Sequence, residues 1–165
     1  MHYIIFVTLI TVLAASIPHD YTSKSVGSNT GTPFRLSGEG SVTAVRTWEY
    51  LNVVYGIQLC YGDTWTTGAG TAIGHMQQFK LFDGETIVQV SGQFTCYITW
   101  LMFVTSSGRS FVAGHPSGKS FNMYPEYKEA ELLLITGTAH RALTGFSAQW
   151  TDIPMRPQCP HFDLQ

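Results

Sequence analysis

The feature of this sequence that most limits its fold is a strand pattern that recurs three times at nearly constant spacing. Similar apolar segments occupy residues 56–61, 100–105 and 145–150. Ile57 precedes Leu101 by 44 residues, and Leu101 precedes Phe146 by 45. A second apolar segment lies upstream of each one, at residues 42–45, 87–90 and 132–135. The chain is therefore expected to contain three similar two-strand units.

Each of these units predicts a sheet with one apolar face, which a single sheet cannot hide from water. Three such faces turned inward would share one core and give the molecule pseudo-threefold symmetry. The apolar residues alternate with polar ones, and turn residues separate the segments, which is typical of strands. Charged residues make up only 12% of the chain, about half the usual share of roughly 25%. A β-sandwich in which the spacing arose by chance is the alternative.

One segment has helical propensity, between Tyr124 and Leu134, where Glu126, Lys128 and Glu129 are concentrated. It is short, contains Pro125 and continues into a run of Leu and Ile. We therefore expect a turn that enters a strand, and an all-β fold class. The polar stretch from residue 21 to residue 40 is rich in Gly, Ser and Thr and is expected to be loop or edge strand.

The two ends of the chain differ in composition from the rest. Residues 3–15 are almost entirely apolar and are followed by the small residue Ser16. This run is too short for a membrane-spanning helix of about 20 residues, so residues 1–16 are predicted to be a signal peptide and the protein to be secreted. A buried first strand is the alternative. Residues 153–165 form a Pro-rich tail.

Export would place the three cysteines, Cys60, Cys96 and Cys159, in an oxidising compartment that favours a disulfide. The odd number leaves one thiol over or implies one intermolecular bridge, and the pairing stays open. The cysteine spacing does not fit a zinc motif, and the six histidines are scattered. We expect neither a metal nor a cofactor.

The net charge of −2 gives no basic field that could attract nucleic acid or an acidic membrane surface. No stretch after the N-terminal run reaches the length of a bilayer span. The expected partners are therefore neither nucleic acids nor membranes.

Several segments, taken together, resemble one known family. They are residues 57–65, 83–92, 101–109, 111–121 and 135–137, with Trp150. In this order they are similar to jacalin-type lectin domains, in particular to the vertebrate zymogen granule membrane protein 16 family. The resemblance covers about residues 27–150 and implies a β-prism of three four-stranded Greek-key sheets. We accordingly expect a lectin domain over residues 27–152.

In that family a carbohydrate site lies at one end of the prism, on three loops. The resemblance implies that the corresponding residues here are Asn29, Thr30, Gly31, Gln93, Phe94, Thr95, His140, Arg141, Leu143 and Thr144. His140 and Thr144 stand where the family's terminal loop has Gly and Asp. A neutral hydrogen bond contributes about 1 kcal/mol, against about 1.5–3 for a charged one. This difference argues against simple mannose binding and leaves another glycan or a polyanion open, bound through His140, Arg141 and Gln93.

The function that these features predict is that of a secreted, non-enzymatic carbohydrate-binding protein. The alternative is a protein-interaction or signalling module on the same fold that has lost sugar binding. A glycosidase would need two carboxylates about 5–9.5 Å apart in one cleft. The acidic residues Asp63, Glu85 and Glu126 are expected in separate turns, so no enzyme is predicted.

Overall fold

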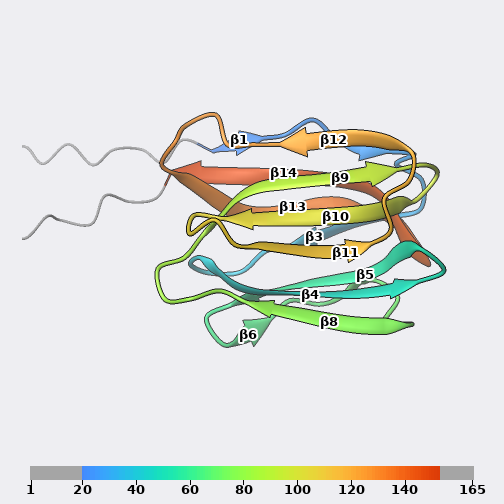
Figure 1. Ribbon diagram of the computed structural model, residues 1–165, viewed down its shortest axis with the longest axis horizontal. Helices are drawn as coiled ribbons and strands as arrows, with labels where there is room; N and C mark the ends of the chain where they lie inside the picture. The colour runs from blue at the N-terminus through green and yellow to red at the C-terminus, as the bar shows by residue number, and fades with distance from the viewer. Residues whose placement is uncertain (1–19, 153–165) are drawn as a thin grey trace, which may run out of the picture.

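The computed structural model describes residues 20–152, which form three β-sheets and no helix. Every strand pair in these sheets is antiparallel. The three sheets stand side by side around a common axis, with their strands running along the length of the molecule (Figure 1). The all-β prism expected from the threefold repeat is confirmed.

A long hairpin forms the centre of each sheet. The hairpins are β4 (Val42–Tyr50) with β5 (Val53–Tyr61), β9 (Ile87–Phe94) with β10 (Ile98–Thr105), and β13 (Ala130–His140) with β14 (Ala142–Asp152). Each recurring pair of apolar segments in the sequence lies within one of these hairpins. The segment with helical propensity is a turn that leads into β13, as predicted.

The hairpins are extended by shorter strands on both sides, in the same order in each sheet. The outer strands are β1 (Tyr21–Thr22), β2 (Val26–Gly27), β3 (Thr32–Leu36), β6 (Thr64–Trp65), β7 (Ala69–Gly70), β8 (His75–Lys80), β11 (Ser110–Gly114) and β12 (Lys119–Met123). The first hairpin strand pairs with β3, β8 or β12. The second hairpin strand pairs with β1 and β2, with β6 and β7, or with β11.

Two of the sheets contain five strands where four were expected, because one outer strand is split in two. The residues between the two halves still bond to the hairpin. Thr66 N donates to Leu59 O at 2.9 Å, between β6 and β7. Ser23 N donates to Ala148 O at 2.8 Å, between β1 and β2. The four-position arrangement is therefore kept, with an interruption in the outer strand.

The core lies along the axis where the three sheets meet. Val45, Val90 and Ile135 occupy equivalent places on the first hairpin strands, 45 residues apart, and each is fully buried. Ile57, Leu101 and Phe146 are fully buried on the second strands. The spacing that identified the repeat is thus the spacing of the residues that the three sheets bury against one another.

The hairpin tips and the chain ends lie at opposite ends of the prism. All three tips are at the right-hand end of Figure 1, and the ends of the described chain are at the left. These are named the tip end and the terminal end. Between residues 20 and 152 the structure has no helix that is long and apolar enough to cross a membrane.

Candidate functional site

The loop of residues 27–31 and the β13–β14 turn meet at the tip end. Asn29 N donates to Thr144 O at 3.3 Å, which joins the loop to β14. The loop is bent by positive φ angles at Gly27 (96°), Asn29 (52°) and Gly31 (103°). A Cβ atom on Gly31 would lie 2.3 Å from Ala139 O, so only glycine allows this close approach to β13. The structure therefore brings two of the three predicted loops together.

The β9–β10 turn also meets this loop, although not through the residues that the sequence singled out. Ser28 Oγ donates to Cys96 O at 2.9 Å. Thr95 is exposed in the same turn, and Tyr97 is 36% exposed beside it. No motif in the sequence pointed to Cys96 or Tyr97, which lie in the turn between β9 and β10.

Gln93 and Phe94 belong to β9 and are half-buried. Gln93 Nε2 donates to Ser120 Oγ at 3.1 Å, and the ring of Phe94 packs 6.2 Å from that of Phe121. Both contacts are with β12, in their own sheet. Of the predicted second loop, only Thr95 is exposed beside the residue 27–31 loop.

Two predicted residues of the terminal loop have buried side chains. Leu143 is fully buried and belongs to the core. Thr144 is 2% exposed, and its Oγ1 donates to Thr30 O and lies 2.9 Å from Thr138 Oγ1. The hydroxyl of Thr144 thus fastens the residue 27–31 loop to the hairpin.

The exposed groups of the predicted site are therefore those of the loop and of the two turns. They are Asn29, Thr30, Gly31, Thr95, His140 and Arg141. Asn29 Oδ1 accepts a hydrogen bond from Ser25 Oγ at 2.6 Å, and Asn29 Nδ2 donates to Gly27 O at 3.2 Å. His140 and Arg141 stand at the hairpin tip, where Arg141 has a φ of 65°. These groups offer an imidazole, a guanidinium and hydroxyls to a polar ligand.

The residue 27–31 loop has two counterparts that the sequence analysis missed. Glycines with positive φ recur four residues apart in each sheet, at Gly27 and Gly31, Gly70 and Gly74, and Gly114 and Gly118. In each pair, added Cβ atoms would lie within 2.3 Å of hairpin carbonyl oxygens. The spacing of these glycines, 43 and 44 residues between the first members, could have revealed them.

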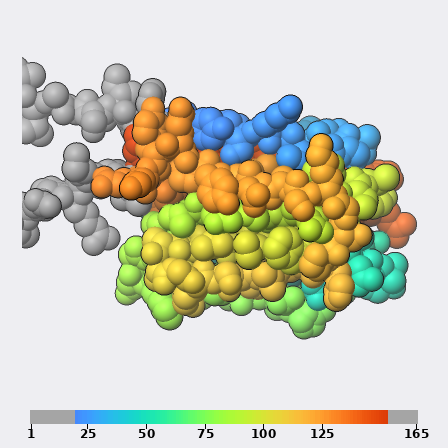
Figure 2. Space-filling model, turned by 45° about the horizontal axis from the view of Figure 1, so that its top comes forward, coloured from blue at the N-terminus to red at the C-terminus, as the bar shows by residue number. Residues whose placement is uncertain are grey.

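Each of these glycine loops is bonded to the hairpin of the neighbouring sheet, in a cyclic order around the axis. The contacts are Ser28 Oγ to Cys96 O at 2.9 Å, Thr71 Oγ1 to Arg141 O at 2.7 Å, and Gly114 N to Glu49 Oε2 at 2.6 Å. The tip end is consequently one connected surface. In Figure 2 the blue, yellow-green, red-orange and teal segments gather at its right-hand end.

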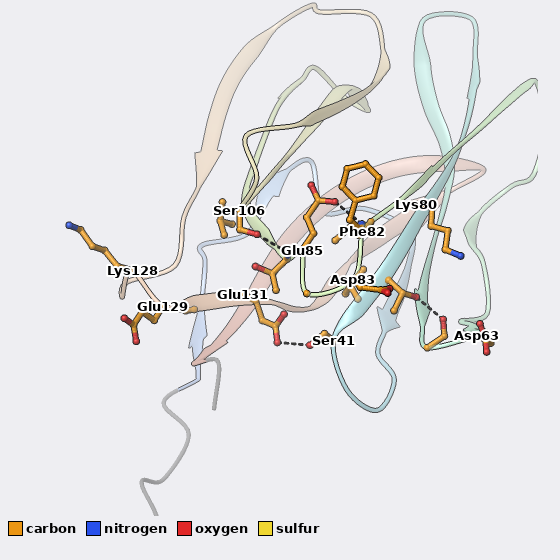
Figure 3. Close-up of a pocket in the computed structure, with 18 residues that line it drawn as sticks. Ser41, Asp63, Lys80, Phe82, Asp83, Glu85, Ser106, Lys128, Glu129 and Glu131 are labelled. Atoms are coloured by element: carbon orange, nitrogen blue, oxygen red, sulfur yellow. Dashed lines mark hydrogen bonds between the residues drawn. The ribbon is translucent and has the colours of Figure 1, made fainter. Parts of the chain in front are cut away.

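The terminal end has a different chemical character. A hollow of about 800 Å³ opens there between the loops that precede β4, β9 and β13 (Figure 3). Its charged lining residues are Asp63, Lys80, Asp83, Glu85, Lys128, Glu129 and Glu131. Five of these are acidic and two are basic, so the hollow carries an excess of negative charge.

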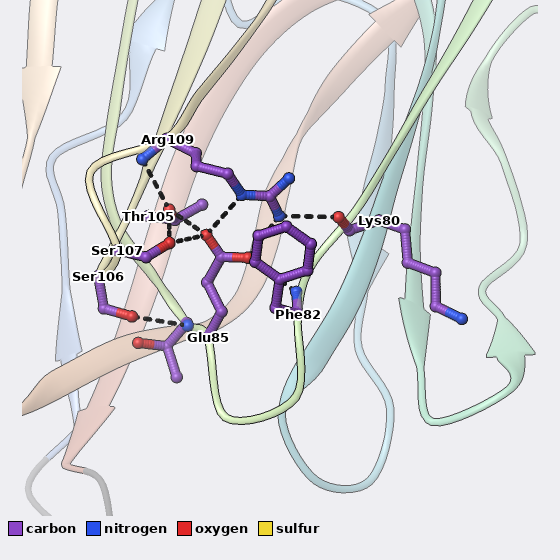
Figure 4. A network of polar contacts seen from close by, with 8 residues as sticks. Lys80, Phe82, Glu85, Thr105, Ser106, Ser107 and Arg109 are labelled. Carbon is purple, nitrogen blue, oxygen red and sulfur yellow. Dashed lines mark hydrogen bonds and ion pairs between the residues drawn. The ribbon is translucent and has the colours of Figure 1, made fainter.

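Glu85 is fully engaged in an ion pair at the edge of this hollow (Figure 4). Arg109 donates to both of its oxygens, from Nε at 3.0 Å and from Nη2 at 2.5 Å. Thr105 Oγ1 and Phe82 N also donate to the carboxylate, at 2.5 and 2.7 Å. The guanidinium of Arg109 holds the pKa of Glu85 well below its usual range. Glu85 therefore stays ionised and has a structural role, consistent with its prediction as a turn charge.

Glu131 also lines the hollow and has no cationic partner of this kind among residues 20–152. It is only 7% exposed, and Ser41 Oγ donates to its Oε1 at 2.7 Å. Thr86, which also lines the hollow, is 8% exposed, and its hydroxyl has no hydrogen-bond partner in the described part of the chain. A buried carboxylate is costly unless it is paired, so this hollow is suited to receive a cation.

The cysteines and histidines of residues 20–152 form no metal site, and no three metal-ligating side chains come together there. Cys60 is buried and Cys96 is exposed, and neither forms a disulfide in this part of the chain. Cys159 lies outside the described residues, as do the predicted signal peptide and the whole of the predicted tail.

Comparison with known proteins identifies the family. The model of the jacalin-like lectin domain matches residues 23–147. Zymogen granule membrane protein 16 of Rattus norvegicus is 33% identical over 135 residues, which cover 80% of this chain and 81% of that protein. Prostatic spermine-binding protein of the same species is 31% identical over 88% of this chain, but the match spans only 53% of that relative.

Among solved structures, a prostate-specific WGA16 glycoprotein lectin has a TM-score of 0.70. The two sequences are 24% identical, and the match covers 78% of this chain and 96% of that one. This likeness supports the β-prism fold, and the sequence matches support the family. The chain belongs to the jacalin-like lectin domain family.

Proposed function

We propose that this protein is a non-enzymatic carbohydrate-binding protein whose glycan site lies at the tip end. The observation that carries the proposal is the contact between Ser28 and Cys96, which joins the residue 27–31 loop to the β9–β10 turn. Together with Thr144, this contact fixes loops from two sheets around one exposed surface. Sugar hydroxyls need donors and acceptors at fixed positions, and a clamped loop provides them without a large ordering cost.

The ligand groups that we assign to the site are Asn29, Thr30, Gly31, Thr95, His140 and Arg141. Gln93 and Phe94 support the second turn from β9, and Leu143 and Thr144 support the terminal loop from inside. The hydroxyl of Thr144 is engaged with Thr30 and Thr138, so a sugar would receive no acceptor from it. We infer that the bound glycan differs from simple mannose.

We further propose that the protein is secreted or stored in secretory granules. The apolar N-terminal run and the small residues that follow it support a cleaved signal peptide. Relatives named zymogen granule membrane protein 16, at 33% identity over most of the chain, support association with such granules. Mass spectrometry of protein collected from the medium of expressing cells would test this, with a mature N-terminus near Ile17 expected.

A glycan array tests the main proposal. Binding to neutral or sulfated glycans is expected. The Arg141→Gly variant and the His140→Ala variant should each lose most of this binding. Glycine suits the positive φ of position 141, so this variant removes the guanidinium without adding strain. Lys80→Ala, at the terminal end, is the control and should bind normally. An array that stays blank would reject glycan binding and favour the protein-interaction alternative.

A second candidate function is the binding of an organic polycation in the hollow at the terminal end. The observation in its favour is Glu131, a buried carboxylate bonded by Ser41 and facing a hollow with an acidic excess. Two relatives are named prostatic spermine-binding protein, and spermine is a linear polyamine. Calorimetric titration with spermine should show binding that Glu131→Gln weakens and Glu126→Gln, a variant outside the hollow, does not. Equal binding by all three proteins would reject this site.

A further inference from the structure

An exposed apolar rim lies at the tip end, next to the proposed glycan site. It consists of Tyr50, Leu51 and Ile73, which are 47%, 70% and 41% exposed. Tyr50 and Leu51 come from the β4–β5 turn, and Ile73 comes from the second glycine loop. Apolar side chains that stay exposed to water at a hairpin tip add no stabilisation from burial. The stability of the fold therefore does not explain why these residues are apolar.

The backbone conformation of the β4–β5 turn is also unfavourable for Leu51. Leu51 and Asn52 form a two-residue turn between paired residues Tyr50 and Val53, with φ angles of 49° and 59°. Asn tolerates this left-handed region, whereas a branched apolar residue such as Leu is unfavourable there. Leu51 gains little packing in return, since at 70% it is the most exposed of the large apolar side chains in the described part of the chain. A strained and exposed leucine points to a role in recognition.

The rim is connected to the glycan site by contacts within the tip end. Thr71, in the second glycine loop, donates from Oγ1 to Arg141 O at 2.7 Å. At the other end of this loop, a Cβ atom on Gly74 would lie 2.8 Å from Cβ of Tyr50. The loop therefore runs from the β13–β14 turn to the β4–β5 turn, and Ile73 lies within it. A ligand held at Arg141 can extend along this loop to the rim.

The chemistry of the rim suits a sugar ring. A pyranose has an apolar face of C–H groups and a polar edge of hydroxyls, so it packs on aromatic and aliphatic side chains beside hydrogen-bonding groups. The ring of Tyr50 is held by an edge-to-face contact with Tyr55, with centroids 5.6 Å apart at 81°. This contact restricts the ring before any ligand binds, which reduces the entropy lost on binding.

We propose that the rim is a second subsite for an outlying residue of the glycan, and that the ligand is an oligosaccharide and not a single sugar. This inference rests on the proposed glycan site at Arg141. The first subsite orients the ligand through hydrogen bonds, and the rim adds apolar contact that a monosaccharide cannot reach. Affinity should therefore rise with glycan length until the rim is covered.

The test uses an array printed with graded series of mannose, N-acetylglucosamine and galactose oligomers, from one unit to six. At least one series should bind at least tenfold more tightly at its longer members than at its monosaccharide. The double variant Leu51→Asn with Ile73→Ser should reduce this ratio to below threefold and leave monosaccharide binding unchanged. Tyr124→Ala removes a side chain of similar exposure (51%) after β12 and is the matched control.

The single variant Leu51→Asn adds a readout that does not depend on binding, because Asn relieves the strained turn. It should raise the melting temperature while lowering oligosaccharide affinity. Affinity that is independent of length, or insensitive to the rim variants, would overturn this inference and leave the glycan site in place. A complete lack of binding to every series would overturn this inference, and binding of another glycan on the wider array would then leave the glycan site in place.

Discussion

The hydroxyl of Thr144 lies 2.9 Å from the hydroxyl of Thr138, across the β13–β14 hairpin and out of contact with solvent. The same Thr144 hydroxyl donates to Thr30 O, in the residue 27–31 loop. One small side chain thus joins the hairpin to the loop that borders the proposed glycan site. Thr144 thus has a structural role at the position where the resemblance implies an acidic ligand group.

Replacement of this hydroxyl should destabilise the protein. Thr144→Val keeps the shape of the side chain but removes its hydrogen bonds to Thr30 O and Thr138 Oγ1. This loss should cost about 1–3 kcal/mol. Urea denaturation should show this loss in the free energy of unfolding. The exposed Thr67→Val is the control and should change it little. Equal stability of the two variants would show that Thr144 does not fasten the loop.

Because the glycine loops lie so close to the hairpins, alanine should destabilise the protein more at a loop glycine than at a glycine that faces open space. Gly31 and Gly40 both have positive φ, 103° and 82°, so alanine at either is strained by about 1–2 kcal/mol. Only at Gly31 would the new Cβ meet backbone, 2.3 Å from Ala139 O, whereas Gly40 faces open space. Gly31→Ala should lower the free energy of unfolding at least twice as much as Gly40→Ala. Similar losses would contradict the close approach.

A buried tyrosine predicts an alkaline limit of stability. Tyr61 is 5% exposed and donates from its hydroxyl to Leu133 O at 2.6 Å. Burial raises its pKa above the ordinary value. The folded protein therefore holds this proton more tightly than the unfolded chain, and stability falls as the pH rises above about 10. Tyr61→Phe should remove this part of the fall in urea denaturation series; an unchanged alkaline slope would contradict it.

The ion pair of Glu85 and Arg109 predicts an acid limit. The pKa of Glu85 is depressed in the folded protein, so its contribution is complete above the unfolded value of about 4.3 and is lost as the pH falls below it. Glu85→Gln should unfold more easily at neutral pH. Its free energy of unfolding should also fall less steeply than that of the unchanged protein between about pH 5 and about pH 3. Glu126→Gln, in an exposed turn, should keep the steep acid slope. If the stability of Glu85→Gln still fell steeply with pH, another group would be responsible for the acid sensitivity.

The fold could be predicted from the sequence because the three sheets bury equivalent residues. Val45, Val90 and Ile135 recur at one spacing since each must point to the same axis. The split outer strands could not be foreseen, because pieces of two residues, such as those formed by Thr64 and Trp65, carry no periodicity.

The site was less predictable, for physical reasons that differ between residues. Asn29 and Arg141 lie exposed on loops at the tip end, and their part in binding stays a prediction, whereas the burial of Thr144 depends on the direction of one side chain after a tight turn. Cys96 and Ser28 meet only because separate sheets close on each other, and no local pattern reports such a contact. The rim residue Leu51 could not be predicted from the sequence because its strain lies in the backbone conformation.

The most direct test of the central claim is an NMR titration of the ¹⁵N-labelled protein with the glycan that gives the strongest array response. We predict amide shift changes at residues 28–31, 96–97 and 140–141, all at the tip end. Changes confined to residues 80–86 and 128–131, around the acidic hollow at the terminal end, would contradict it.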